Sequence, residues 1–172
     1  MVKDTEVEER EEVLISSEKM NKIKNKILIM SGKGGVGKTT VAVNLAYSLI
    51  KKNYDVGILD IDIHGPNVPK MLNLNVKGIK TYEERIVPAM FENKLKVMSM
   101  AFLLNKDSDA VIWRGPAKHG VIKQFVNDVN WGKLDYLIID LPPGTGDEPL
   151  SITQILKPVT GAVIVSTPQE VA

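Results

Sequence analysis

The chain has 172 residues, of which 44% are hydrophobic and 25% charged, with a net charge of +1 and no cysteine. This composition is typical of a globular domain with a substantial core, and it excludes disulfide bonds and thiolate metal ligands within these residues. The near-zero charge favours neither nucleic acid nor a membrane surface as a partner, and no apolar run approaches the roughly 20 residues that span a bilayer.

Residues 1–25 form a charge-rich segment, which we expect to be a solvated lead-in. Its beginning, "MVKDTEVEEREE", is acidic and lacks the apolar stretch of a secretory signal. A cytoplasmic protein is therefore expected.

A strand, a helix and a second strand are predicted over residues 26–63. "KILIMS" (26–31) is a short apolar run typical of a buried strand, and so is "DVGILDIDI" (55–63). From Lys38 onward, apolar residues recur at helical spacing: Ala42, Leu45, Ala46 and Leu49. Parallel neighbouring strands need such a crossover helix between them, so the order strand–helix–strand predicts a parallel sheet.

The second half of the chain continues this pattern. "IVPAMFENKLKVMSM" (86–100) predicts two short strands around the turn "ENK", and "LDYLIIDL" (134–141) and "TGAVIVST" (160–167) predict two further buried strands. Residues 115–129 carry apolar side chains at helical spacing and predict a helix. The predicted fold class is therefore α/β, with a doubly wound and mostly parallel sheet, and no repeat or linker divides it.

Residues 32–39 match the phosphate-binding pattern G-x-x-x-x-G-K-[ST] and lie between the first predicted strand and the helix, as the mechanism of this motif requires. Glycines let backbone N–H groups approach a phosphate, and the helix N-terminus adds a partial positive charge. We expect Lys38 to reach the β- and γ-phosphates of ATP and the Thr39 hydroxyl to ligate Mg²⁺. A glycine turn without a ligand would leave both residues unexplained. The residues predicted to bind the nucleotide are Gly32, Lys33, Gly34, Gly35, Val36, Gly37, Lys38, Thr39 and Thr40.

This motif predicts that residues 26–172 form a P-loop nucleotide-binding domain. In such a domain, acidic residues at the ends of parallel strands are candidates for binding the metal and for orienting the attacking water. Asp140 directly follows the apolar run of its strand, which is the Walker B position that holds Mg²⁺, and a strand-end cap is the alternative. Asp60 and Asp62 lie at i and i+2, on one face of an extended strand. One is expected to support the metal or the loop and the other to orient the attacking water, unless the two belong to surface salt bridges. The metal candidates are Thr39, Asp140 and Asp60.

Four further side chains are predicted to be structural. His64 and His119 lack metal-ligand spacing and are expected to be loop or surface residues, whereas Trp113 and Trp131 are expected to pack in the core.

Lys33 directly follows the first glycine of the loop, where an ordinary P-loop does not require a lysine. "KGGVGKTT" resembles the deviant Walker A motif of the SIMIBI class, which includes MinD, ParA, nitrogenase iron protein and the arsenite and tail-anchored-protein ATPases. The resemblance implies that Lys33 reaches across a dimer interface to the partner's nucleotide. A second cation there would neutralise charge that develops on the transferring phosphoryl group. A surface lysine is the alternative.

Several longer segments resemble a narrower group, the Mrp (ApbC) family of ATP-dependent iron–sulfur cluster carriers. These segments are "DIDIHGPNVPKML", "VMSMAFLL", "WRGPAKHGVIKQF", "DYLIIDLPPGTGDEPLSI" and "VIVSTPQEVA", so that the resemblance runs from about Lys26 to Ala172. It implies an ATPase that acts as a homodimer and transfers clusters to apo iron–sulfur client proteins. Its catalytic residues would be Lys33, Lys38 and Asp62, with Asp62 positioning the water.

The pattern of that family continues past the last residue of this chain. Its members add further strands, an asparagine that contacts adenine, and a C-x-x-C pair that bridges a cluster between subunits. We therefore expect this chain to lack the cluster site and to have weak or incomplete ATPase activity by itself. The alternatives are a ParA/MinD-like ATPase switch for spatial organisation, and a P-loop kinase or ligase. The basic patch or amphipathic C-terminal helix that would favour the first is missing, and the second leaves Lys33 unexplained.

Overall fold

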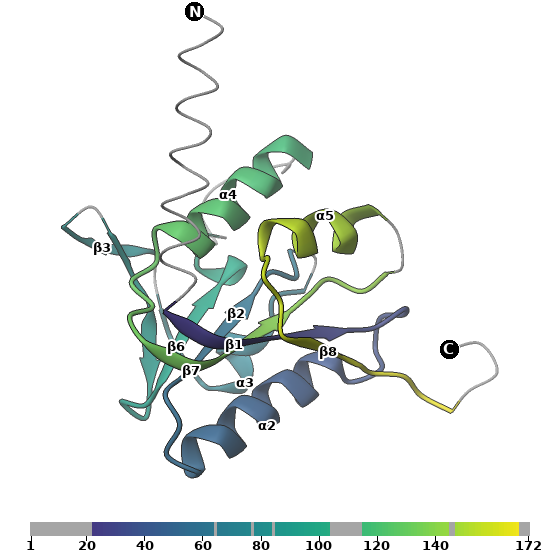
Figure 1. Ribbon diagram of the computed structural model, residues 1–172, viewed down its shortest axis with the longest axis horizontal. Helices are drawn as coiled ribbons and strands as arrows, with labels where there is room; N and C mark the ends of the chain where they lie inside the picture. The colour runs from purple at the N-terminus through teal and green to yellow at the C-terminus, as the bar shows by residue number, and fades with distance from the viewer. Residues whose placement is uncertain are drawn as a thin grey trace, which may run out of the picture.

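A six-stranded sheet forms the centre of the computed structural model, which describes residues 22–63, 65–76, 78–83, 85–103, 115–144 and 147–168 (Figure 1). The strand order is β5-β6-β2-β7-β1-β8, and all neighbours are parallel except β5 and β6. The strands are β1 (Ile23–Met30), β2 (Val56–Asp60), β5 (Ala89–Phe91), β6 (Leu95–Ser99), β7 (Leu134–Asp140) and β8 (Gly161–Ile164).

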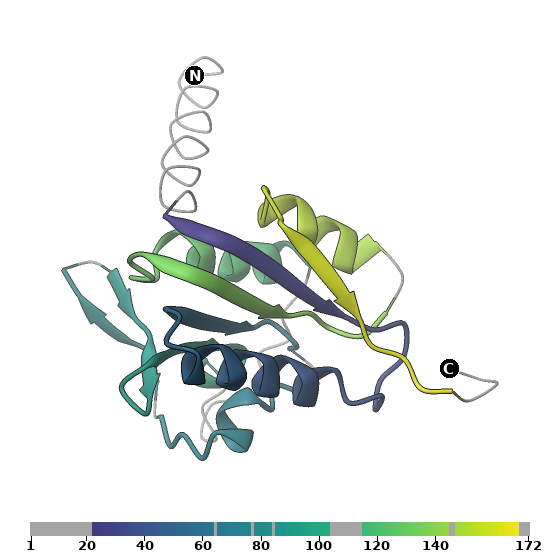
Figure 2. The same ribbon diagram turned by 60° about the horizontal axis from the view of Figure 1, so that its bottom comes forward.

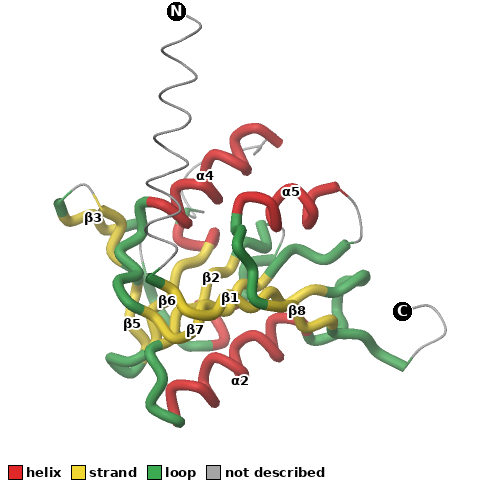
Figure 3. Tube along the Cα trace, in the orientation of Figure 1, coloured by secondary structure: helices red, strands yellow, loops and turns green. Residues whose placement is uncertain are grey.

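Helices cover both faces of this sheet (Figures 2 and 3). One face carries α2 (Lys38–Lys51) and the short α3 (Val68–Met71), and the other carries α4 (Gly115–Asn127) and α5 (Asp147–Ile155). A 3-10 turn, η1 (Met100–Phe102), follows β6. These three layers confirm the predicted doubly wound, mostly parallel α/β fold. No helix in the described ranges is long and apolar enough to cross a membrane.

The region predicted as two strands around "ENK" contains three. The turn is confirmed between β5 and β6, where Glu92 and Asn93 adopt positive φ angles of 50° and 53°. The first predicted strand is interrupted at Pro88, which has no N–H to donate to a ladder. Its earlier half, β4 (Arg85–Val87), pairs with β3 (Lys80–Tyr82) in a separate two-stranded hairpin.

All five residues of β2 and most residues of β7 are buried, as their apolar sequences predict. Gly57 lies so close to its neighbours that a Cβ atom there would be 2.9 Å from side-chain atoms of both Trp131 and Leu134. Trp131 is 4% exposed, and its Nε1 donates a hydrogen bond to the backbone oxygen of Phe125 at 3.0 Å, which confirms its predicted packing role. Trp113 lies outside the described residues.

The first and the last predicted strands differ from the observed ones. β1 begins at Ile23 instead of 26, because Ile23 is buried between the exposed residues Lys22 and Lys24, and the Lys24 Nζ atom lies 2.6 Å from Asp135 Oδ1. The strand predicted over 160–167 is shorter, and the prediction that it is buried is wrong: Ile164 is 77% exposed. β8 is the last strand in the sheet order and has a neighbouring strand on one side only. Its apolar run is therefore less covered by the rest of the protein than those of β2 and β7.

Candidate nucleotide-binding site

The glycine loop connects the end of β1 to the start of α2, as predicted. Gly35 and Gly37 have φ angles of 81° and 90°, in the left-handed region that side chains other than glycine rarely adopt. Gly37 is the N-cap residue of α2 and has no side chain with which to cap that end of the helix. The first-turn N–H groups and the positive end of the helix dipole are therefore available to an anion.

A cleft of about 440 Å³ opens at this helix end. Seven of the nine predicted nucleotide-binding residues line it, whereas Gly32 and Val36 do not. Among the described residues, the lining consists of Ser31, Lys33, Gly34, Gly35, Gly37, Lys38, Thr39, Thr40, Asp62, Gly65, Asn67 and Pro143. The volume and the backbone-rich lining are suited to a phosphate-bearing ligand.

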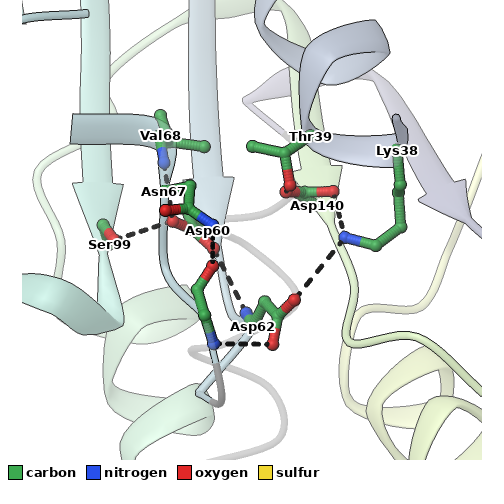
Figure 4. A network of polar contacts seen from close by, with 9 residues as sticks. Lys38, Thr39, Asp60, Asp62, Asn67, Val68, Ser99 and Asp140 are labelled. Atoms are coloured by element: carbon green, nitrogen blue, oxygen red, sulfur yellow. Dashed lines mark hydrogen bonds and ion pairs between the residues drawn. The ribbon is translucent and has the colours of Figure 1, made fainter. Parts of the chain in front are cut away.

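Asp140, the last residue of β7, contacts the first two residues of α2 (Figure 4). The Lys38 Nζ atom donates to Asp140 Oδ1 at 2.7 Å, and the Thr39 hydroxyl donates to Asp140 Oδ2 at 2.6 Å. The Asp140 carboxylate has no exposed surface, and Lys38 is 6% exposed. Burial raises the pKa of Asp140, while the hydrogen bonds and charge of Lys38 and Thr39 act in the opposite direction. This geometry favours the Walker B assignment over a simple strand-end cap.

Asp62 faces the same lysine from the loop after β2. Its Oδ2 atom is 3.9 Å from Lys38 Nζ, and its Oδ1 atom accepts a hydrogen bond from the Gly65 N–H at 3.3 Å. Because Asp62 also lines the cleft, its carboxylate can contact a group bound beside Lys38.

Asp60 lies in a different environment. It is fully buried at the end of β2 and is not part of the cleft lining. Burial, and secondarily the charge of neighbouring Asp140, raise its pKa to about 7. Its oxygens accept hydrogen bonds from the Ser99 hydroxyl at 2.9 Å, the Val68 N–H at 3.3 Å and the Asp62 N–H at 3.2 Å.

The prediction that Asp60 and Asp62 share one face of an extended strand is therefore wrong. β2 ends at Asp60, so the regular alternation of side chains does not continue to Asp62, and the two carboxylates take different directions (Figure 4). The sequence left open whether one member of this pair supports the metal or the loop. The geometry favours a role for Asp60 in supporting the loop.

Several cleft residues were not predicted from the sequence. Ser31 is 3% exposed, and its hydroxyl has no hydrogen-bond partner within the described ranges, while its carbonyl accepts from the Gly144 N–H at 2.9 Å. Gly65 and Asn67 also line the cleft, and the Asn67 side chain donates to the Gly65 oxygen at 2.8 Å. Gly65 and Asn67 belong to the segment "HGPN" (64–67), which begins two residues after Asp62. This closeness to the acidic pair was the sequence signal that could have predicted their place in the cleft.

Only one of the two histidines predicted to be structural lies in the described part of the chain. His119 is partly exposed in α4 and does not line the cleft, and His64 lies outside the described residues. Among the described residues, no group of three or more histidine, cysteine or acidic side chains is arranged to hold a metal ion. Mg²⁺ bound with a nucleotide needs only one or two protein oxygens besides phosphates and water. The adjoining Thr39 hydroxyl and Asp140 carboxylate are chemically suited to supply them.

The first strand of this parallel sheet leads through a glycine loop into a helix. The lysine and the threonine that begin the helix contact a carboxylate on the adjacent strand. This arrangement defines a P-loop nucleotide-binding protein. The family model described as "ParA: NUBPL iron-transfer P-loop NTPase" matches residues 22–172. The chain belongs to this family.

Individual relatives agree with this assignment. An iron–sulfur cluster carrier protein of Methanocaldococcus jannaschii is 54% identical over 155 residues, which are 90% of this chain and 53% of the relative. A cytosolic Fe-S cluster assembly factor Nubp2 homolog of Anopheles gambiae is 53% identical over 157 residues, which are 89% of this chain and 61% of the relative. The solved nucleotide-binding protein from Archaeoglobus fulgidus in complex with ADP is 45% identical with a TM-score of 0.79, and the match covers 91% of this chain and 60% of that one. The chain thus spans between 53% and 61% of the length of these three proteins.

Proposed function

We propose that this chain binds ATP with Mg²⁺ and hydrolyses it as part of an iron–sulfur cluster carrier that works as a nucleotide-dependent homodimer. The observation that carries the proposal is the contact of Lys38 and Thr39 with Asp140 at the open N-terminal end of α2. The ADP bound to the Archaeoglobus fulgidus protein supports a nucleotide as the ligand.

Each residue of the cleft has a part in this proposal. The loop amides and the Lys38 ammonium would bind the β- and γ-phosphates. Thr39 and Asp140 would hold Mg²⁺, which supplies neutralisation of the phosphate charge. Asp62 would accept a hydrogen bond from the attacking water at its carboxylate and so orient it. Lys33, which also lines the cleft, would donate to the nucleotide of a second protomer.

The iron–sulfur cluster is the cargo in this proposal, supported by the names of the Methanocaldococcus jannaschii and Anopheles gambiae relatives. Protein-bound clusters are held mainly by cysteine thiolates, and these 172 residues contain no cysteine. We therefore assign to this chain the nucleotide-dependent step and not the cluster ligands. The name of the Anopheles gambiae relative also supports the expected cytoplasmic location.

The experiment measures three properties of the purified chain: calorimetric binding of ATP and ADP with and without Mg²⁺, release of phosphate, and visible absorbance after incubation with ferrous iron and sulfide. We expect Mg²⁺-dependent nucleotide binding, slow turnover and no bound cluster. A chimera that continues this chain with the remaining residues of the Methanocaldococcus jannaschii relative serves as the comparison. Absence of nucleotide binding in both proteins would contradict the proposal. A stable stoichiometric cluster on the chain alone would contradict the assignment of the cluster ligands.

A further inference from the structure

The loop between β2 and α3 forms one wall of the nucleotide cleft, through Asp62, Gly65 and Asn67. Both ends of this wall are hydrogen bonded to the same carboxylate. The Asp62 N–H donates to Asp60 Oδ1 at 3.2 Å, and the Val68 N–H donates to Asp60 Oδ2 at 3.3 Å (Figure 4). Asp60 therefore holds the beginning and the end of the wall without lining the cleft.

Ser99 holds Asp60 in turn. Ser99 is the last residue of β6 and the register neighbour of Asp60 in the sheet, and its hydroxyl donates to Asp60 Oδ2 at 2.9 Å. The Ser99 oxygen also accepts the Ala101 N–H at 3.1 Å, which ties the hydroxyl to the start of η1. Both side chains have no exposed surface. A buried carboxyl is unfavourable unless its oxygens are satisfied, so the Ser99 hydroxyl and the two amides act as one unit.

The position of Asp62 depends on this unit. The Asp62 carboxylate is held at its Oδ1 atom by Gly65, inside the wall, and its Oδ2 atom is 3.9 Å from Lys38 Nζ. If the wall shifts, Asp62 shifts relative to Lys38, and a water oriented by Asp62 loses its alignment with the phosphate. Small displacements of a positioning group reduce turnover strongly while leaving the binding contacts in place.

We propose that Asp60 and Ser99 are positioning residues, which act through the backbone amides of Asp62 and Val68 to hold the Asp62 carboxylate at the phosphate end of the cleft. The inference deepens the proposed function and rests on it for the role of Asp62. Neither residue would touch the nucleotide, so their loss should reduce kcat and not the affinity for MgATP.

The test compares the purified wild-type chain with Ser99→Ala, Ser99→Thr and Asp60→Asn. Threonine keeps the hydroxyl, whereas asparagine replaces one acceptor oxygen with a donor that faces another donor. Val97→Ala is the matched control, because it removes buried methyl groups two residues earlier in β6 without altering the polar unit. Amide hydrogen exchange of residues 62–68 reports on the wall, and exchange of β7 reports that each variant is folded.

We expect Ser99→Ala and Asp60→Asn to accelerate exchange in residues 62–68 by roughly tenfold or more while β7 stays protected. We expect kcat to fall about tenfold with KM for MgATP within about twofold of wild type, and Ser99→Thr to restore both measurements. Unchanged exchange in folded Ser99→Ala and Asp60→Asn would overturn the proposal, whatever the turnover. The proposal would also be overturned if Val97→Ala gave the same response. It would be overturned too if Ser99→Ala and Asp60→Asn accelerated exchange but left kcat unchanged, provided that the wild-type chain hydrolyses ATP. If the wild-type chain does not hydrolyse ATP but exchange responds as expected, the positioning of the wall is supported and the proposed hydrolysis is contradicted.

Discussion

Lys38 and Asp140 lie 102 residues apart in the sequence, yet the Nζ atom of the first is 2.7 Å from the Oδ1 atom of the second. The contact is buried at the carboxyl end of the sheet, where β7 is the register neighbour of β1. Removing both charges from water is unfavourable, so a buried ion pair is weak evidence of a purely stabilising role. Its position at the open end of α2 instead fits a lysine held ready for phosphate.

Replacement of Lys38 by alanine should weaken binding of MgATP by about 100-fold or more, since it removes the cation expected at the β- and γ-phosphates. It should also lower the free energy of unfolding by about 3 kcal/mol, because Asp140 loses its buried partner. Calorimetry and urea denaturation measure the two effects. Lys51→Ala, at the exposed end of the same helix, is the control and should leave affinity unchanged. An unaltered affinity in folded Lys38→Ala would mean that the phosphate site is misassigned.

The Asp62→Asn variant should bind MgATP with an affinity within about threefold of wild type and hydrolyse it about 10- to 100-fold more slowly. Asparagine keeps the shape of the side chain but lacks the charge that orients the water. Single-turnover phosphate release on saturated protein isolates this step. Asp55→Asn, an exposed position at the opposite end of β2, should behave like wild type. If Asp62→Asn retains full turnover, the water must be oriented by another group.

Lys38 is expected to contact the nucleotide of its own protomer and Lys33 the nucleotide of the partner. In the chimera with the remaining residues of the Methanocaldococcus jannaschii relative, Lys33→Ala and Asp62→Asn should each lower the activity of the homodimer by about tenfold or more. Mixing them should restore part of the activity, because one site in each mixed dimer keeps its own Asp62 and receives Lys33 from the partner. Phosphate release after mixing measures the recovery, and differently tagged subunits establish that mixed dimers form. No recovery in established mixed dimers would place Lys33 in its own site.

Stability should fall as the pH rises from about 4 to about 7. The folded-state pKa of Asp60 is raised from 3.8 to about 7, so in this range the folded protein holds a proton that the unfolded chain has released. The stabilisation present below the ordinary pKa is therefore lost as the pH approaches the folded-state value. At about 1.4 kcal/mol per pKa unit, the loss amounts to as much as about 4 kcal/mol.

Urea denaturation at several pH values, without Mg²⁺ or nucleotide, measures this dependence. Asp60→Asn should flatten the decline, although Asp140, whose pKa burial also raises, contributes in the same direction. Asp135→Asn is the control. The hydrogen bond from Lys24 lowers the pKa of Asp135, so its stabilisation is lost only as the pH falls below the ordinary carboxyl range. An equal decline in wild type and Asp60→Asn would contradict the assignment to Asp60.

Gly57→Ala should destabilise the fold by about 1–3 kcal/mol, because the new methyl group would meet Trp131 and Leu134 at 2.9 Å in the middle of the sheet. Gly120→Ala is the matched control: it lies in α4 with no atom within 4 Å of the added Cβ, and alanine favours the helix by up to about 1 kcal/mol. Thermal and urea unfolding should therefore move in opposite directions for the two variants. A neutral Gly57→Ala would show that the sheet accommodates the methyl group without strain.

The sequence alone determined the features that depend on neighbours along the chain. The glycine loop, Lys38 and Thr39 lie within a few residues of one another, so their joint use by one phosphate site follows from local geometry. The apolar runs that became β2 and β7 are buried on both faces, and this needs only their composition and a parallel sheet. Asp62 was expected near the phosphate site because acidic residues at the carboxyl ends of parallel strands lie at the ligand edge of the sheet, and it does line the cleft.

Only the tertiary structure decided the features that depend on strand order and on where each strand ends. Asp140 meets Lys38 because β7 lies directly beside β1, although β2 precedes it in the chain. Asp60 and Asp62 have different environments because β2 stops between them, and a periodicity argument cannot locate that end. Ser99 became the partner of Asp60 through the register of β6 against β2, a long-range pairing that no local pattern of residues encodes.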